Sequence, residues 1–274
     1  MTHLPLLRLD RHGMLLTILD SDTKGTHAMA VSPLMRWWQR LSKYRPSARP
    51  LLLVGWLASG YAVARYYRRL VAEHGLSPQA LAERADQKAV AFYDHLFEHV
   101  ALPNPLTVLD IGCGMGDMIT YLNEHGVQID GYLGLDLVDI FVQTCRERYG
   151  PPYRFRRENF ISPGFHTAER FAIVLNMGGM VSRVVGYEAY IAACCEKMLL
   201  LATHTVLFNV ITEVQSTSEN YTAAGRVGQI TTIAKPQLVA ILDQLTRESS
   251  WEYTLHDAYI YPDAADTFVY LRRA

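Results

Sequence analysis

Short apolar runs and longer stretches with helical spacing alternate along most of the chain. Val108, Leu109 and Ile111 form a run that is typical of a strand buried on both faces, and residues 118–122 then resume a helical pattern. The alternation continues to the end of the sequence. Further strands are predicted at 132–137, from 153, and at 171–176, 204–211, 251–261 and 267–271, with helices at 140–149, 187–201 and 235–247. The pattern therefore predicts an α/β fold with seven strands, the last two of which close it.

The first hundred residues follow a different pattern, with two hydrophobic runs and then helices. The runs at 4–9 and 14–19 predict a hairpin or an irregular start within an N-terminal extension, residues 1–50. Residues 51–64 are apolar, but the stretch is shorter than the roughly 20 residues that cross a bilayer, so we expect a buried helix. The alternative is an in-plane membrane anchor, for which aromatic and basic residues at 36–40 lie just upstream.

Residues 51–100 are predicted to be helical and to precede a domain that spans 101–274. Within this region Ser77 and Pro78 have the chemistry of a helix start, and residues 85–100 are predicted to form an amphipathic helix. This helix leads into the first strand.

Three alternate glycines join that strand to its helix. Gly112, Gly114 and Gly116 lack a Cβ, so this loop can turn sharply and bring its backbone close to a ligand. A dinucleotide site usually has the spacing G-x-G-x-x-G, with a pyrophosphate over the helix start, whereas this loop has G-x-G-x-G. Asp110 stands two residues before the first glycine, where a carboxylate repels a pyrophosphate but accepts a hydrogen bond from an ammonium group. The spacing and Asp110 together favour a nucleoside with an ammonium group over a dinucleotide.

A second carboxylate follows at the end of the next strand. Asp136 closes the apolar run that starts at Tyr132, and it stands 26 positions after Asp110. An acidic residue there can accept hydrogen bonds from both hydroxyl groups of a ribose. The alternative is a carboxylate that caps the next helix and binds no ligand. Because Asp136 lies at the expected separation from the glycine loop, we favour the ribose contact.

At these residues the chain resembles the class I S-adenosylmethionine-dependent methyltransferases, whose first motif reads hydrophobic-Asp-x-Gly-x-Gly-x-Gly. The resemblance covers about residues 60–274 and is closest to bacterial small-molecule members with an N-terminal helical cap and a Phe-Asn pair in the fifth strand, here Phe208 and Asn209. It implies a seven-stranded, mostly parallel sheet with helices on both faces, a closing antiparallel strand, and residues 51–100 as a cap. The implied cofactor is S-adenosyl-L-methionine, which leaves as S-adenosyl-L-homocysteine.

The resemblance also implies a set of cofactor-binding residues. They are Asp110, Gly112, Cys113, Gly114, Gly116, Asp136, Leu137, Asn159, Phe160 and Asn176, with Tyr67 and Gln87 reaching the site from the cap. Two positions depart from the family pattern. Asn159 stands where an Asp commonly binds the adenine amino group, and Ala172 stands where many members have an Asp. An amide oxygen also accepts a hydrogen bond, so the first change weakens the match without removing the function.

Methyl transfer from a sulfonium needs a nucleophile held in line and water kept out, and it needs neither a metal nor a covalent residue. We therefore expect methylation of a small molecule, on oxygen or nitrogen rather than carbon. A hydroxyl or a protonated amine must lose a proton, and the candidate catalytic residues are Asn176, His166 and His204. Each histidine alone is more often structural, and Asn176 has three open roles: it orients the acceptor, lines the methionine part of the cofactor, or ends a plain turn.

The overall charge and the cysteines bear on the partner and on the cellular location of the protein. The 274 residues carry a net charge of −1, which does not predict a nucleic-acid partner, although Arg154, Arg156 and Arg157 form a local basic group. The four cysteines show neither metal spacing nor a paired framework, so a reduced, cytoplasmic location is expected. We expect a small-molecule substrate and consider a homodimer through the extension. The alternatives are a nucleic-acid or protein methyltransferase and a non-catalytic S-adenosylmethionine-binding partner subunit.

Overall fold

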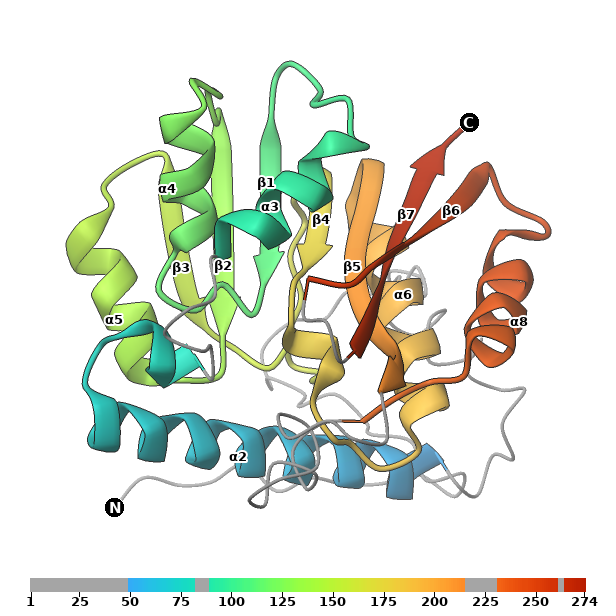
Figure 1. The fold of residues 1–274 in the computed structure, drawn as a ribbon, viewed down its shortest axis with the longest axis horizontal. Helices are drawn as coiled ribbons and strands as arrows, with labels where there is room; N and C mark the ends of the chain where they lie inside the picture. Colours follow the sequence, from blue (N-terminus) through green and yellow to red (C-terminus); the bar gives the residue numbers. More distant parts are fainter. Residues whose placement is uncertain (1–48, 82–88, 215–230, 261–263) are drawn as a thin grey trace, which may run out of the picture. The chain divides into compact units, whose positions relative to one another are not determined.

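The computed structural model describes four stretches of the chain, residues 49–81, 89–214, 231–260 and 264–274 (Figure 1). The chain divides into Met1–Leu51 and Leu52–Ala274, and the described fold is that of the second unit. The hairpin predicted within residues 1–50 and the predicted cap residue Gln87 lie outside the described residues.

A seven-stranded sheet forms the centre of this unit, in the order β3-β2-β1-β4-β5-β7-β6. Its strands are β1 Thr107–Ile111, β2 Gly131–Asp136, β3 Tyr153–Arg157, β4 Phe171–Asn176, β5 Ala202–Val214, β6 Trp251–Ala258 and β7 Ala264–Arg273. Strands β1 to β5 are parallel, and β7 runs antiparallel to both of its neighbours. The predicted mostly parallel sheet with a closing antiparallel strand is therefore confirmed. The last strand of the chain lies inside the sheet, because β7 separates β5 from β6.

Helices cover both faces of the sheet, as predicted. They are α2 Arg49–His74, α3 Ala89–Glu98, α4 Asp117–Glu124, α5 Asp139–Arg148, α6 Tyr187–Leu201 and α8 Lys235–Thr246, with short helical turns η2 Pro78–Leu81 and η3 Gly179–Val181. The chain winds from β1 through β2 to β3 by right-handed crossovers, so α4 and α5 lie on one face together with α3. From β4 to β5 the chain proceeds toward the opposite end of the sheet, so α6 and α8 lie on the other face (Figure 1). Sheets of this kind bind ligands at the carboxyl ends of the strands where the order reverses, here between β1 and β4.

The main core lies between the sheet and helices α3, α4 and α5. Leu96, Ile119 and Val142 of these helices pack in one cluster with Tyr132 and Phe268 of the sheet, and all five side chains are buried. Burial of one such side chain contributes about 1.5–3 kcal/mol. Strand β4 is buried along its full length because helices cover both faces, which explains its continuous apolar sequence.

Helix α2 lies across the carboxyl ends of the strands (Figure 1). The helix predicted at 51–64 is present, but the prediction that it is buried is wrong in part. Trp56 and Ala64 are buried, whereas Val54 is 64% exposed and Tyr61 is 67% exposed. The reason is that α2 packs on the sheet edge with one face only. In the part of the chain that the structure describes, no helix is both long and apolar enough to cross a membrane.

Candidate functional site

The glycine loop runs from β1 to α4 and folds over the carboxyl end of β2. Gly112, Gly114 and Gly116 have φ angles of 81°, 52° and 82°, a region that residues with a side chain rarely adopt. The amides of Gly112 and Cys113 donate to the carbonyl oxygen of Leu135 at 2.7 and 3.0 Å. These two amides thus anchor the loop to β2 and hold its shape.

The surroundings of the three glycines differ. A Cβ at Gly114 would lie 3.1 Å from a side chain of η2, and a Cβ at Gly116 would lie 2.7 Å from the ring of Tyr149. At Gly112 the nearest atom to such a Cβ is the Cα of Gly179, at 3.8 Å. Packing therefore excludes a Cβ at the third position unless the Tyr149 ring moves, and at the second it requires a small shift of the η2 side chain. At the first, the main chains of Gly112 and Gly179 face each other beside the point where the strand order reverses, so a ligand can approach the backbone.

Asp136 ends β2 with its carboxylate between two amides. Gly114 N donates to Oδ2 at 3.0 Å, and Val138 N donates to Oδ1 at 2.8 Å. Burial raises the pKa of this carboxyl to about 6, against the lowering effect of the amides. Helix α5 has Val138 as its N-cap residue, so Asp136 does not occupy the capping position that was the alternative. Each carboxylate oxygen has a second lone pair, and the residue is partly exposed, so it can still accept hydrogen bonds from a ligand.

Asp110 lies deeper, within β1. It is 4% exposed, and its Oδ2 accepts a hydrogen bond from the hydroxyl of Tyr132 at 2.6 Å. Burial raises the pKa of this carboxyl to about 7, the Tyr132 hydroxyl lowers it, and the nearby Asp136 raises it further. The carboxylate is therefore poised to change its charge near neutral pH, and a cation beside it would favour the ionised form.

Helix α2 closes over the carboxyl edge at several points. A Cβ at Gly60 would lie 2.8 Å from Nδ2 of Asn159, so a larger residue there would displace the Asn159 side chain or the helix. Trp56 Nε1 donates to the carbonyl oxygen of Val185 at 2.9 Å, and Tyr67 packs on a ring of α5 at 6.3 Å between ring centres. The Oδ1 atom of Asn159 accepts a hydrogen bond from a following backbone amide at 3.2 Å. The predicted residues Tyr67, on α2, and Asn159, after β3, therefore both lie where α2 meets the carboxyl edge of the sheet.

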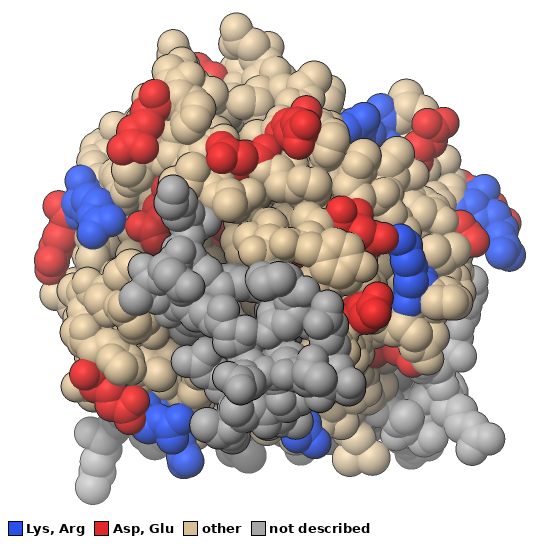
Figure 2. All heavy atoms as spheres, viewed as in Figure 1, with Lys and Arg blue, Asp and Glu red and all other residues tan. Residues whose placement is uncertain are grey.

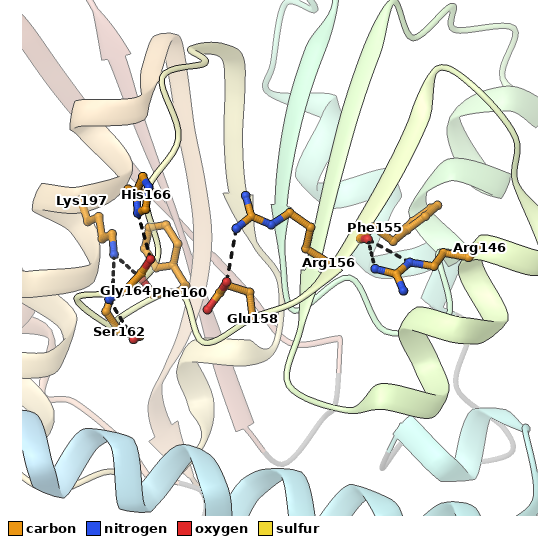
Figure 3. Close-up of polar contacts among 9 residues, drawn as sticks. All are labelled: Arg146, Phe155, Arg156, Glu158, Phe160, Ser162, Gly164, His166 and Lys197. Atoms are coloured by element: carbon orange, nitrogen blue, oxygen red, sulfur yellow. Dashed lines mark hydrogen bonds and ion pairs between the residues drawn. The ribbon is translucent and has the colours of Figure 1, made fainter. Parts of the chain in front are cut away.

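A buried lysine holds the loop that follows β3. Lys197 of α6 donates to the carbonyl oxygens of Phe160 and Ser162 at 2.6 and 3.0 Å (Figure 3). Its Nζ lies 5.2 Å from the ring centre of Phe160 and 4.9 Å from that of Phe165. Burial lowers the pKa of Lys197 to about 8. The Phe160 ring is therefore held in a cluster beside α6, and its contact with an adenine ring stays a prediction.

Buried polar side chains also lie at the carboxyl end of β4, where Asn176 stands, and between β5 and the start of β7, where Asn209 meets Asp266. Asn176 is 4% exposed, and its Oδ1 has no hydrogen-bond partner among the described residues. Asn209 accepts from Gly178 N at 2.7 Å and donates to Asp266 Oδ1 at 2.9 Å. Asp266 is 2% exposed, its Oδ2 also lacks a described partner, and burial raises its pKa to about 6. Buried oxygens without a protein partner are uncommon, and their explanation is a functional role, strain, or a bound water or ion.

The three candidate catalytic residues lie in different places. Asn176 ends β4 beside the glycine loop. His166 is exposed in the connection between β3 and β4, and its Nδ1 lies 3.0 Å from the carbonyl oxygen of Gly164 (Figure 3). His204 is exposed near the start of β5, at the amino ends of the parallel strands. The structure therefore brings Asn176 to the site and leaves His204 at the opposite edge of the sheet.

Several residues of these clusters have no role in the sequence-based prediction. Asp266 has a signal in the sequence, because a carboxylate in the apolar run at 264–271 is uncommon unless it is paired or functional. Gly60 has a weaker one, since a glycine inside a helix often marks a close contact. Tyr132 carries no such signal, because its contact with Asp110 depends on how two strands align.

Comparison with known proteins shows likeness in fold at low sequence identity. The sequence profile of the mRNA (guanine-N(7))-methyltransferase domain matches residues 90–180, less than half of the chain. No curated protein matches the sequence. Magnesium protoporphyrin IX methyltransferase (ChlM) from Synechocystis PCC 6803, solved with bound SAH, is 13% identical over 79% of this chain and 100% of its own, with a TM-score of 0.53.

Two further structures are similar. The DhpI-SAM-HEP complex is 14% identical over 80% of this chain and 98% of its own, with a TM-score of 0.51. The small RNA methyltransferase HEN1 is 13% identical over 67% of this chain but 24% of its own, with a TM-score of 0.52. The likeness rests on the arrangement of strands and helices rather than on shared residues. The chain therefore has the Rossmann-like fold of the class I S-adenosylmethionine-dependent methyltransferases.

Proposed function

We propose that this protein is an S-adenosylmethionine-dependent methyltransferase that acts on a small molecule. The observation that carries the proposal is the Asp136 carboxylate, which two amides hold at the end of β2 with a lone pair left on each oxygen. A ribose has two neighbouring hydroxyl groups that can donate to such a pair of oxygens. The fold supports S-adenosylmethionine as the nucleoside, and two of the similar structures are described as complexes with SAM or SAH.

Residues around this carboxylate fit the remaining parts of the cofactor. Gly112 and Gly179 expose main chain close to the buried Asp110, which suits the charged amino acid end. Asn159 lies under α2, where an amide oxygen can accept from an adenine amino group. The cofactor supplies an electrophilic methyl group when it is bound. The protein holds the donor, covers it with α2 and excludes water, and alignment of the reactants can contribute several kcal/mol.

The acceptor binds, in this proposal, at the end of β4 between Asn176 and the hydrogen-bonded pair of Asn209 and Asp266, which Gly178 N joins to the connection after β4. The two unpaired oxygens accept hydrogen bonds, so they select a substrate with a hydroxyl or amine donor. With a pKa of about 6, Asp266 is mostly ionised at neutral pH. It can take the proton that an O–H or N–H group loses as its oxygen or nitrogen bonds to the methyl carbon, while the electrons of the broken carbon–sulfur bond stay on sulfur. Methylation on oxygen or nitrogen is favoured over carbon for this reason.

A nucleic-acid methyltransferase is the second candidate, and the profile match at residues 90–180 and the likeness to HEN1 favour it. The matched stretch includes the glycine loop and Asp136 but ends before Asn209 and Asp266, so it concerns the cofactor half. On the face drawn in Figure 2, the described acidic and basic side chains are interspersed and form no broad basic surface for a phosphate backbone. Turnover of a capped RNA without turnover of small amines or alcohols would favour this candidate.

Calorimetry with S-adenosylhomocysteine tests the cofactor site. Asp136→Ala removes both ribose contacts, and Asp110→Ala removes the buried carboxylate. Each should weaken binding at least tenfold, because a hydrogen bond to a charged group contributes about 1.5–3 kcal/mol. If both variants bind as tightly as the wild type, the assignment fails.

Asp139→Ala is the matched control, since this carboxylate is exposed, pairs with Arg68 at 2.8 Å, and its loss should leave binding unchanged. Circular dichroism shows that each variant is folded. Tight binding by the wild type without turnover of any acceptor would instead favour a non-catalytic partner subunit.

A further inference from the structure

Three side chains of types that can bind a metal gather at the C-terminal end of α3. His95 and Glu98 belong to its last turn, and His99 is the residue that follows the helix. Each offers one ligand atom, and these atoms lie within 4.8 Å of one another. The rings of His95 and His99 contact residues of β7 and β6, so the group is separate from the glycine loop.

The sheet beneath supplies another imidazole and holds the end of the helix. His256 of β6 stacks on His99, with ring centres 4.0 Å apart and an interplanar angle of 19°. The Tyr270 hydroxyl donates to the carbonyl oxygen of His95 at 3.1 Å, and Arg272 donates to that of His99. Two contacts from β7 to the backbone of His95 and His99 therefore fix the positions from which the three side chains project.

The inner nitrogen of His95 is unpaired. Nε2 of this residue is buried and has no hydrogen-bond partner among the described residues, although buried polar nitrogens in proteins are normally bonded. A metal binds the unprotonated nitrogen of an imidazole, so this unpaired nitrogen offers a ligand position.

We infer that His95, Glu98 and His99 bind a divalent transition metal, with Zn²⁺ as the best fit. His256 becomes the fourth ligand when its ring turns out of its stack on His99, because two stacked rings cannot both direct a nitrogen at one ion. Imidazole and carboxylate groups in a four-coordinate site are ligands that zinc prefers. Zinc bonds of about 2.0–2.2 Å require ligand atoms about 3.3 Å apart, so the group must contract on binding. Glu98 can turn inward without loss of packing, because its side chain is 67% exposed.

The metal would clamp α3 to β6, and this gives the site a structural role. Helix α3 leads into β1 and the glycine loop, so its attachment to the sheet affects the start of the cofactor half. A fully coordinated zinc stabilises a fold directly and needs no open position for a substrate.

Zinc titration of the full chain tests the inference, with no affinity tag and after removal of metals by a chelator. Competition with a chromogenic chelator should report one Zn²⁺ per chain, and Zn²⁺ should raise the Tm. Bound Co²⁺ should show the intense visible absorption of a tetrahedral site. Glu98→Gln and His99→Gln should each weaken Zn²⁺ binding at least tenfold. Because Glu98 is exposed, the first of these variants keeps its fold.

Two further variants sharpen the result. His125→Gln is the matched control, because this histidine lies outside the cluster, with its Nδ1 2.8 Å from the carbonyl oxygen of Tyr121, and its loss should leave zinc affinity unchanged. Weaker binding by His256→Gln supports the fourth ligand, and unchanged binding removes it from the site. The inference is overturned if the chain binds no zinc, or if Glu98→Gln and His99→Gln bind it as tightly as the wild type. None of these measurements needs the cofactor, so they are independent of the proposed function.

Discussion

The two halves of the carboxyl edge of the sheet are built differently. At the ends of β1 and β2, the protein donates hydrogen bonds to both carboxylates, from Tyr132 to Asp110 and from two amides to Asp136. At the end of β4 and the start of β7, Asn176 Oδ1 and Asp266 Oδ2 have no partner among the described residues. The first half is organised before any ligand binds, whereas the second leaves buried polar atoms unpaired, which costs stability.

This difference matches the two tasks proposed for the site. A fixed cofactor can be bound by one preorganised set of groups, and preorganisation lowers the entropy that is lost on binding. An acceptor must also be told apart from similar compounds. A site with buried hydrogen-bonding groups rejects a compound that leaves those groups unpaired. The unpaired oxygens of the second half would therefore provide selectivity for the acceptor at the expense of stability.

The largest effect is expected from Gly116→Ala, which would disrupt the first half. Gly116 has a φ of 82°, and a Cβ there would lie 2.7 Å from the Tyr149 ring. We expect the free energy of unfolding to fall by about 2–4 kcal/mol, through the strained backbone and the displaced ring. Gly126→Ala is the control: its φ is 70°, but no atom lies within 4 Å of the added Cβ, so its loss should be about 1 kcal/mol. Equal losses in urea denaturation would show that packing does not hold the loop.

Asp266→Asn should have the opposite effect in the second half and raise the stability of the free protein. The pKa of Asp266 is about 6 in the folded state against a usual 3.8, so its ionisation above about pH 6 opposes folding. A pKa shift of this size should raise the free energy of unfolding of the variant by about 1–3 kcal/mol at pH 7. This increase should become smaller as the pH falls toward 4. Urea denaturation at pH 7 and pH 4.5 measures the gain. A variant that is less stable than the wild type at pH 7 would contradict the idea that the buried Asp266 carboxylate lowers the stability of the free protein.

The smallest effect is the pH dependence of S-adenosylhomocysteine affinity. The pKa of Asp110 is raised to about 7, mainly by burial, and an ammonium group prefers the ionised carboxylate. Affinity should therefore fall as the pH drops below about 7, by up to tenfold per pH unit. Calorimetry at pH 6 and pH 7.5 measures this change, and Asp110→Asn should flatten it. A wild-type affinity that is the same at both pH values would exclude the contact with Asp110.

The sequence alone determined where individual helices and strands form and that the glycine loop lies beside Asp136. Helix α6 begins at Tyr187 and ends at Leu201, as its apolar spacing predicts, because period and burial are recorded in the residues themselves. The glycine loop and Asp136 do lie together, with Gly114 N on the carboxylate. Their proximity follows from the sequence because both come at the ends of parallel strands, and such ends meet at one edge of the sheet.

Only the tertiary structure decided which strands and helices became neighbours. Asn209 meets Asp266, 57 positions away, because β7 inserts between β5 and β6, and no local pattern records that order. The same holds for His99 beside His256 and for α2 over Asn159. A hydrophobic pattern tells which face of an element is buried, but the energy that selects its partner is summed over the whole core. The closeness of the glycine loop and Asp136 could therefore be predicted from the sequence, while the contacts of Asn209 with Asp266 and of His99 with His256 could not.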